Sequence, residues 1–266
     1  MRRRNASTSF NHGRRFMPIT KAIILSAGKG SRLLPLTEDR PKCLIEFSGR
    51  SLLAWQLDSL AANGISEVVV VTGFRDDLVD AVAAARPGVR TLFNPFYHVA
   101  DNLGSVWLAR GEFDRDTLLL NGDTLVSQSL VEKVLAAEVG QICVTIDEKD
   151  DYDADDMKVL REGDRLRRIG KALEPGEYNA ESIGFLAFRG DGPRLFTEQV
   201  DRMMHTSEGT RRWYLRAIDL LAPQVDVRTV NIRGEDWQEV DFPEDLAKAE
   251  ALTARWAAAG TGERAA

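Results

Sequence analysis

The sequence predicts an α/β fold: a Rossmann-like, mixed but mostly parallel sheet flanked by helices, with a small antiparallel sheet in its second half. Residues 22–25 (AIIL) and 67–72 (EVVVVT) are short apolar runs, typical of strands covered on both faces. Up to residue 146 such runs alternate with segments of helical pattern, which indicates βαβ units. From residue 147 onward several strand-like segments follow one another, which predicts antiparallel pairing.

In the first half of the chain, capping and turn residues set the ends of the predicted helices. Ser51 is a helix N-cap residue, Gly64 ends the same helix, and Pro87-Gly88 closes the next one. Ser127 and Ser129 are alternative caps for the fourth helix. The predicted strands span 21–26, 44–47, 67–72, 91–93, 117–120 and 141–146, and the predicted helices span 52–63, 76–86, 102–110 and 130–138.

The second half opens with an acidic stretch, DEKDDYDADD, over 147–156. After it, the predicted strands span 158–160, 166–169, 182–188 and 225–232, and the predicted helices span 193–204, 208–221 and a last segment that begins at Pro243. The chain contains no visible internal repeat or linker. We therefore predict a single domain over 17–258, a disordered basic tail over 1–16 and a frayed C-terminus over 259–266.

Charge and composition exclude several classes of protein. The net charge is −6, and the first sixteen residues carry five arginines and no acidic residue, so the rest of the chain is more acidic than the total. This balance disfavours nucleic-acid binding. The basic tail is interpreted as disordered or as an extended start before Met17, and a transit peptide is the alternative.

The sequence also indicates a cytoplasmic protein without a membrane anchor. It has no signal-peptide pattern, and no apolar run approaches the roughly 18 residues that a membrane span needs. Cys43 and Cys143 lack the spacing of metal ligands and are predicted to be reduced thiols. The oligomeric state stays open, and a homo-oligomer is one possibility.

The most informative stretch is the glycine-rich segment 26–32 (SAGKGSR), directly after the first predicted strand. Gly28 and Gly30 can adopt positive φ and let another group approach the backbone, while Lys29 and Arg32 add positive charge. Backbone N–H groups and cations in one loop suit a polyphosphate. The loop lacks the third glycine of the dinucleotide fingerprint and the Gly-Lys-Ser/Thr end of a P-loop.

The wider segment 25–42 reads L-S-A-G-x-G-S-R-L-x-P-L-T-x(4)-P-K and resembles the signature of the sugar-nucleotide pyrophosphorylase-type nucleotidyltransferases. Along almost its whole length the chain is similar to the bacterial CTP:phosphocholine cytidylyltransferases of that family. The resemblance implies transfer of CMP from CTP to a small phosphorylated alcohol, with release of pyrophosphate and Mg²⁺ as the cofactor. The nucleotide would contact Ser26, Ala27, Gly28, Lys29, Gly30 and Ser31.

Two aspartates are candidate metal ligands. Asp123 follows Asn121-Gly122 at the end of a predicted strand, the edge at which doubly wound sheets bind ligands, and Gly122 is expected to let the substrate come close. Asp241 ends another predicted strand, although an Asp two residues before Pro243 is also a good helix cap. The resemblance implies that Asp123 and Asp241 hold Mg²⁺, whose preferred ligands are oxygens. It also implies that Lys42 acts at the α-phosphate and Arg32 on the leaving pyrophosphate.

Residues 94–110 bear on the choice of nucleotide. They resemble the cytidylyltransferase pattern N-x-x-Y…(D/N)-N-x-x-S and lack the pattern of enzymes that use glucose-1-phosphate. Asn94, Asn102 and Ser105 are therefore candidates to hydrogen-bond cytosine, and Gly122 belongs to the same nucleotide-binding set. Asn102 as a plain helix cap is the alternative.

The acceptor candidates lie in the second half. The resemblance implies a lysine that steadies the acceptor phosphate: Lys171 stands where relatives carry it, and Lys158 is a competing candidate. A solvated strand lysine is the alternative for either residue. Tyr152, Glu181 and Trp237 combine aromatic faces with carboxylates, the chemistry that holds a cationic head group. Acceptors left open are inositol-1-phosphate, aminoethylphosphonate and sugar-1-phosphates. A catalytically inactive regulatory relative is the alternative outside enzymes, but Arg32, Lys42, Asp123 and Asp241 are all present.

Overall fold

The fold is described from a computed structural model over residues 18–137 and 140–262. The predicted basic tail and residues 263–266 lie outside this range. The strands of the main sheet are β1 Lys21–Leu25, β4 Glu67–Thr72, β5 Val89–Phe93, β6 Thr117–Asn121, β8 Ile142–Asp147, β9 Lys158–Glu162, β10 Arg165–Ile169, β11 Ala180–Phe188 and β12 Val227–Asn231. Two short antiparallel pairs lie outside it: β2 Glu46–Phe47 pairs with β3 Arg50–Ser51, and β7 Thr124–Val126 pairs with β13 Trp237–Glu239.

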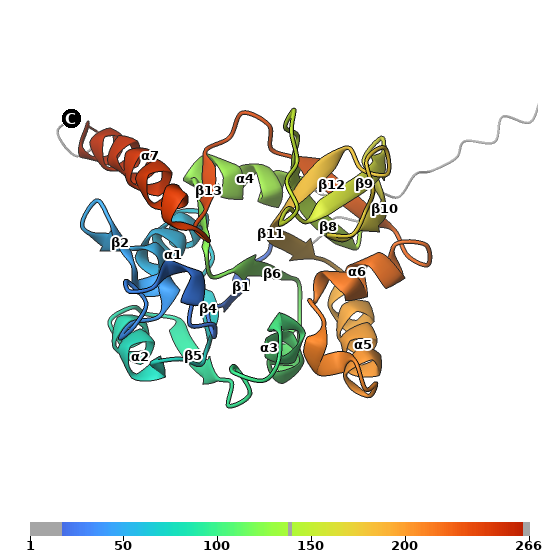
Figure 1. Ribbon diagram of the computed structural model, residues 1–266, viewed down its shortest axis with the longest axis horizontal. Coiled ribbons are helices and arrows are strands. Elements are labelled where there is room, and N and C mark those ends of the chain that lie inside the picture. The colour runs from blue at the N-terminus through green and yellow to red at the C-terminus, as the bar shows by residue number, and fades with distance from the viewer. Residues whose placement is uncertain (1–17, 138–139, 263–266) are drawn as a thin grey trace, which may run out of the picture.

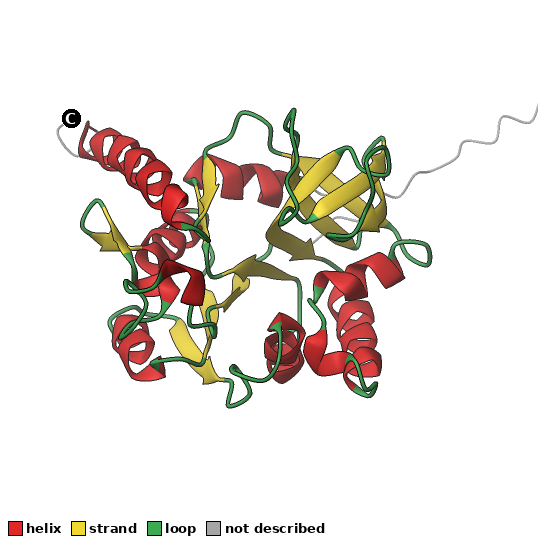
Figure 2. Ribbon diagram, viewed as in Figure 1, coloured by secondary structure: helices red, strands yellow, loops and turns green. Residues whose placement is uncertain are grey.

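Seven α-helices occur within the described residues and pack around the sheet (Figures 1 and 2). They are α1 Leu52–Ala62, α2 Asp76–Ala84, α3 Asn102–Leu108, α4 Gln128–Ala136, α5 Gly192–Met204, α6 Leu215–Leu221 and α7 Pro243–Gly262. None of the helices in the described part of the chain combines the length and the apolar character that crossing a membrane requires.

The nine-stranded sheet has the order β5-β4-β1-β6-β11-β8-β12-β10-β9. Its first four strands are parallel, so the loops after β1 and β6 leave the sheet at the same edge. Strand β11 then runs antiparallel to both β6 and β8. The predicted α/β fold with a mixed sheet is confirmed, but the sheet is not mostly parallel, because parallel pairing is confined to β5-β4-β1-β6 and to β8-β12.

The predicted antiparallel strands are part of this same sheet. β9, β10 and β12 pair antiparallel in succession, and the start of β11 pairs with β9, so the pairings from β11 through β8, β12, β10 and β9 return to β11. A register irregularity in the pairing with β8, between Ser182 and Leu186, separates the part of β11 that also pairs with β9 from the part that also pairs with β6. The strands β11, β8, β12, β10 and β9 therefore form a closed ring of pairings.

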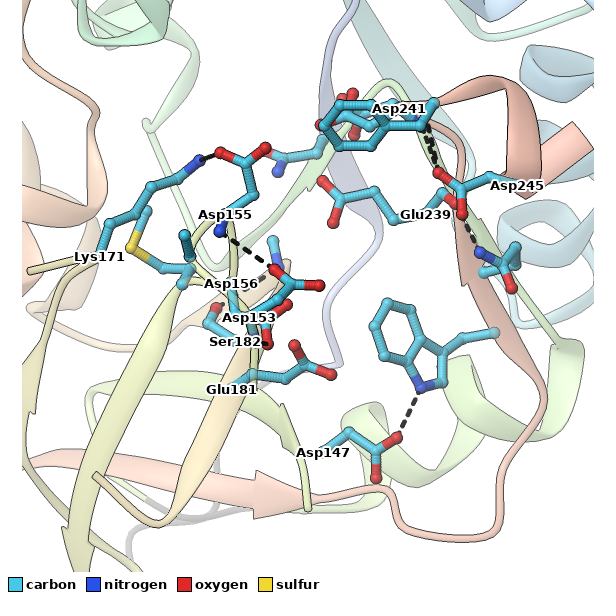
Figure 3. Close-up of a pocket in the computed structure, with 18 of the residues that line it drawn as sticks. Asp147, Asp153, Asp155, Asp156, Lys171, Glu181, Ser182, Glu239, Asp241 and Asp245 are labelled. Atoms are coloured by element: carbon cyan, nitrogen blue, oxygen red, sulfur yellow. Dashed lines mark hydrogen bonds and ion pairs between the residues drawn. The ribbon is translucent and has the colours of Figure 1, made fainter. Parts of the chain in front are cut away.

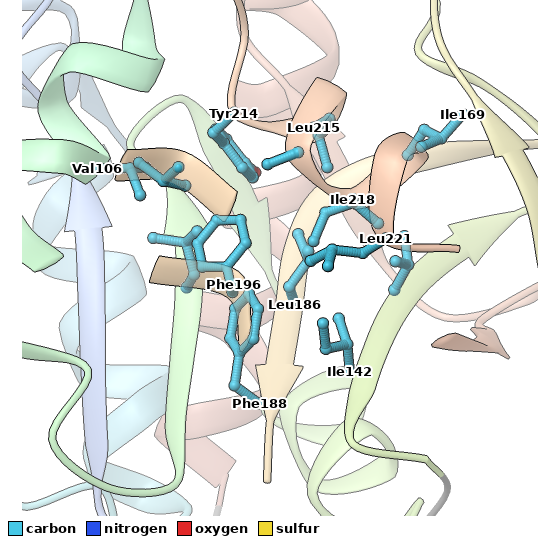
Figure 4. Packing of buried hydrophobic residues seen from close by; sticks show 14 of the residues in the cluster. Val106, Ile142, Ile169, Leu186, Phe188, Phe196, Tyr214, Leu215, Ile218 and Leu221 are labelled. Atoms are coloured by element: carbon cyan, nitrogen blue, oxygen red, sulfur yellow. The ribbon is translucent and has the colours of Figure 1, made fainter. Parts of the chain in front are cut away.

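Successive side chains of the central strands point to opposite faces of the sheet and pack into two separate hydrophobic cores. Ile23 of β1 packs with α3, α5 and α6, whereas Ala22 and Ile24 pack with α1, α2 and α4. Figure 4 shows the first of these cores, where Phe188 and Phe196 stack and Tyr214 lies beside them. Burial on both faces explains why the strand sequences are apolar runs rather than alternating ones.

Several predicted boundaries were wrong. The helix predicted over 208–221 is a 3₁₀ turn at Gly209–Arg211 followed by α6, because Arg212 is extended (φ −122°, ψ 144°). Only Glu46–Phe47 of the strand predicted over 44–47 is paired as a strand, since Lys42–Leu44 forms another 3₁₀ turn. Ser127, rather than Ser129, caps α4 by accepting the Leu130 N–H at 3.1 Å.

Candidate active site

Parallel pairing brings the glycine-rich loop and Asp123 to one edge. Leu25 at the end of β1 is in register with Asn121 at the end of β6, so the loops that follow are neighbours. The Gly122 N–H donates to the Leu25 carbonyl at 2.9 Å. A Cβ at Gly122 would lie 2.2 Å from Ser26 Oγ. The glycine therefore lets the turn approach β1, which corrects the expectation that it makes room for substrate.

Within the loop, Gly30 has the special conformation that the sequence suggested. Its φ is +75°, and a Cβ there would lie 2.8 Å from Lys42 Cβ, so only glycine fits without strain. Gly28 has no positive φ, so that part of the expectation is wrong, but the space beside it is open and another group could approach its backbone. Gly28 and Lys29 are exposed residues, and Lys29 Nζ lies 5.0 Å from the centre of the Phe74 ring. The loop can thus present N–H groups to an anion.

Lys42 lies between the two predicted aspartates. Its Nζ is 2.7 Å from Asp123 Oδ2 and 2.5 Å from Asp241 Oδ1. Burial disfavours the charged ammonium, but the two carboxylates more than offset this and raise the pKa of Lys42 above its usual range. Lys42 is therefore a fixed positive charge at the carboxylates.

Arg32 lies at the outer side of the same cluster. Its guanidinium is 3.3 Å from Asp241 Oδ2 and 3.6 Å from Asp155 Oδ2, and it stacks 4.8 Å from the centre of the Phe242 ring. About half of its side chain, 49%, is exposed. Arg32 can therefore reach a ligand from solvent more freely than Lys42 can.

The capping role considered for Asp241 belongs to another residue. Asp245 Oδ2 accepts the backbone N–H groups of Asp241 and Phe242 at 3.1 and 2.9 Å, which satisfies the start of α7. The Asp241 side chain points instead to Lys42 and Arg32. Its carboxylate is therefore available for chemistry.

Glu239 is a third carboxylate at this place, which sequence reasoning grouped with Trp237 for the acceptor and did not assign to the metal. One oxygen each from Asp123, Glu239 and Asp241 lies within 4.8 Å of the others, and Figure 3 shows Glu239 beside Asp241. Desolvation and the two aspartates raise the pKa of Glu239 to about 8. Glu239 and Asp241 stand two positions apart along an extended segment, a spacing that puts side chains on one face and that could have revealed the pair. Three carboxylates form a donor set that suits a hard divalent cation.

The residues predicted to hold cytosine are differently placed. Asn94 and Ser105 are buried, and Asn94 Nδ2 donates to Ser105 Oγ at 3.0 Å while Asn94 Oδ1 accepts the Phe96 N–H at 2.8 Å. Their polar groups hold the segment after β5 against α3, so in this arrangement they are not presented to a base. Asn102 is partly exposed and accepts the Tyr214 N–H at 3.0 Å, while Asp101 is the residue at the start of α3.

A cavity of about 950 Å³ extends from the three carboxylates between the two halves of the sheet. Figure 3 shows its walls, where carboxylates from β11, β13 and the acidic stretch face one another. Ten acidic residues line it against four basic ones, Arg32, Lys149, Lys171 and Lys248. Such an excess of negative charge favours a cationic ligand.

Three of the five acceptor candidates line the cavity. Lys171 pairs with Asp155 at 3.3 Å, Trp237 Nε1 donates to Asp147 at 2.9 Å, and Glu181 pairs with Lys149 at 2.9 Å. Burial raises the pKa of Glu181 to about 7, partly offset by Lys149.

The other two candidates have structural partners. Lys158 is buried, and its ammonium donates to the Asp153 carbonyl at 2.6 Å. The Tyr152 ring packs edge-on against Tyr178, with centroids 5.1 Å apart. Neither is among the described residues that line the cavity. Trp213 and Lys149, which sequence reasoning did not select, do line it, and Lys171 lies 4.8 Å from the Trp213 ring centre.

The sequence of this chain is similar to those of a known protein family. The family model of the MobA-like NTP transferase domain matches residues 22–219. A CTP:phosphoglutamine cytidylyltransferase from Campylobacter jejuni is 25% identical over 248 residues, covering 85% of this chain and 97% of its own.

Two solved structures have a similar fold. The inositol-1-phosphate CTP transferase from T. maritima superposes with a TM-score of 0.76 at 22% identity, covering 90% of this chain and 97% of its own. The CTP:phosphocholine cytidylyltransferase from Streptococcus pneumoniae gives a TM-score of 0.73 at 22% identity, covering 88% and 98%.

Proposed function

This chain belongs to the MobA-like NTP transferase family, and on that premise we propose that it moves a CMP group from CTP to a small phosphorylated alcohol such as phosphocholine, releasing pyrophosphate. Membership of a nucleotidyltransferase family confirms the resemblance predicted from the glycine-rich loop. One observation carries the proposal: Lys42, Arg32 and three carboxylates meet at the carboxyl edge of the sheet, where an acidic cavity begins.

We propose Mg²⁺ as the cofactor, held by Asp123 and Asp241 with Glu239. The fit rests on the donor set, since three carboxylate oxygens within 4.8 Å of one another are ligands that Mg²⁺ prefers. Bound there, the ion would neutralise charge on the nucleotide phosphates.

In the proposed reaction, a phosphate oxygen of the acceptor attacks the α-phosphorus of CTP, and the bond from that phosphorus to pyrophosphate breaks. No covalent bond to the protein is needed, so catalysis consists of positioning and charge neutralisation. The exposed loop from Gly28 to Ser31 and the Arg32 guanidinium would hold the β- and γ-phosphates. Lys42, already close to the carboxylates, would neutralise the charge that develops at the α-phosphate.

The acidic cavity supports a cationic acceptor. A quaternary ammonium has no hydrogen-bond donors, so aromatic faces and nearby carboxylates are what can hold it. Trp237 and Glu181 line the cavity and supply both kinds of group, and Lys171 is the candidate for the acceptor phosphate. CTP is proposed because relatives of this fold use it and because 94–110 follows the cytidylyltransferase pattern.

The direct test measures pyrophosphate release with Mg²⁺ over four nucleoside triphosphates and three acceptors: phosphocholine, inositol-1-phosphate and glucose-1-phosphate. We expect the highest kcat/KM with CTP and phosphocholine, because the cavity is acidic. A higher kcat/KM with UTP or dTTP would contradict the nucleotide assignment. A clear preference for either neutral acceptor would overturn the cationic site but not nucleotidyl transfer.

Replacing Trp237 with Ala is expected to weaken phosphocholine binding by about 0.5–2 kcal/mol, the range of cation–π contacts from exposed to desolvated. The measurement is KM for phosphocholine at saturating CTP. Tyr152→Ala is the matched comparison, and a smaller effect is expected because its ring packs on Tyr178. An equal loss for inositol-1-phosphate in Trp237→Ala would mean that Trp237 supports the wall of the cavity without contacting a cation.

A further inference from the structure

Helix α1 carries a buried polar stripe on the side that faces the carboxylate site. Gln56, Ser59 and Asn63 are spaced by three and four residues, so they share one face of the helix. Gln56 is 0% and Ser59 4% exposed, which is unusual for polar residues inside a helix between apolar neighbours. Their side chains donate to backbone carbonyls between residues 121 and 128.

Gln56 makes the central contact of this stripe. Its Nε2 donates to the carbonyl of Asn121 at 2.8 Å and to the carbonyl of Thr124 at 2.8 Å. An amide nitrogen has two N–H groups, so both are used, and this contact also fixes which end of the amide is nitrogen. The two carbonyls belong to the first and last residues of the turn that carries Asp123. The amide therefore joins both ends of that turn to a rigid helix.

The turn that carries Asp123 also contacts the segment that carries Glu239 and Asp241. The Val240 N–H donates to the Asp123 carbonyl at 3.0 Å, and Thr124 is in register with Glu239 across the β7–β13 pair. β7 has only three residues and lies outside the main sheet; it pairs with β13 on one side and accepts hydrogen bonds from α1 on the other. A displacement of Asp123 would thus be passed to Glu239 and Asp241.

Packing alone does not explain a glutamine at this position. Gln56 Oε1 is buried and has no hydrogen-bond partner among the described residues. An unpaired buried oxygen destabilises a fold, and a methionine would fill a similar volume without one. Glutamine supplies two side-chain N–H groups that bond to carbonyls of the turn, and methionine has none.

We propose that Gln56 is a positioning residue that sets the location of Asp123, and through it the geometry of the three-carboxylate site. The expected effect on kcat rests on the proposed function, because the proposed function places the metal and the reacting phosphates at those carboxylates. Its structural part, the effect of Gln56 on cation binding by the carboxylates, can be measured without turnover.

The test uses Gln56→Met in the full chain, with Ser59→Ala as the matched control because it removes one neighbouring bond to the Val126 carbonyl. Mn²⁺ affinity is measured by electron paramagnetic resonance without nucleotide, and kcat and KM are measured with CTP and phosphocholine. We expect Gln56→Met to weaken Mn²⁺ binding and lower kcat by about 10- to 100-fold, the usual effect of losing a partner behind a metal ligand. Ser59→Ala should stay close to the wild type in both measurements.

A double-mutant cycle with Asp123→Asn separates positioning from general destabilisation. If Gln56 acts through Asp123, Gln56→Met lowers kcat by a smaller factor in the Asp123→Asn background than in the wild type, whereas a general loss of folded protein lowers activity by the same factor in both backgrounds. Wild-type Mn²⁺ affinity and kcat in Gln56→Met, or losses that multiply in the double mutant, would overturn the proposal. Absence of cytidylyl transfer in the wild-type protein would contradict the proposed function. The Mn²⁺ affinity of Gln56→Met, compared with that of the wild type, would then test by itself whether Gln56 positions the carboxylates.

Discussion

Asn in place of Asp123 or of Asp241 is expected to lower kcat by at least about 100-fold, the scale of deleting one preorganised electrostatic contact. Each carboxylate contacts Lys42 and belongs to the three-carboxylate cluster. Asparagine keeps the size of the side chain and removes its negative charge. The loss should therefore appear in turnover, while the melting temperature and the circular dichroism spectrum stay close to those of the wild type.

Glu244→Gln provides the control for these two substitutions. Glu244 lines the same cavity, but it is exposed and lies outside the three-carboxylate cluster. Glu244→Gln tests whether the loss of any carboxylate charge in the cavity lowers kcat. Near-wild-type kcat in Asp241→Asn would show that Asp241 is not part of the reaction centre, and a 100-fold loss in Glu244→Gln would show that the effect is not local.

The parts of the site that are continuous in sequence were accessible to prediction. The apolar run of β1 and the glycines after it predicted a strand followed by a tight loop, and the apolar run of β6 predicted the strand at whose end Asp123 lies. This worked because strand burial and turn conformation are local properties that residue type encodes directly.

The contacts between distant segments were not accessible in the same way. Glu239 joins Asp123 only because β13 pairs with β7, whose residues are more than a hundred positions earlier in the chain. Asn94 and Ser105 were expected to bind a base, yet they bind each other across two elements. The break before α6 depends on the extended backbone at Arg212, and no proline or glycine marks it between 212 and 221.

Lys42→Ala is expected to lower kcat by about 100- to 1,000-fold with little change in the KM for CTP, because its ammonium would act on charge that develops only in the transition state. Only 15% of the Lys42 side chain is exposed, and two carboxylates hold its position. Arg32→Ala is expected to raise the KM for CTP as well, because the exposed guanidinium would bind phosphates of both ground and transition states.

Steady-state kinetics with CTP varied at saturating phosphocholine separate the two roles. Lys171→Ala is the control for charge, since Lys171 lines the same cavity but pairs with Asp155 and not with the carboxylate cluster. We expect Lys171→Ala to raise the KM for the acceptor. An unchanged kcat in Lys42→Ala would remove that lysine from the chemistry, and a loss of kcat without a rise in KM for CTP in Arg32→Ala would place the arginine at the reacting phosphorus instead of on the leaving pyrophosphate.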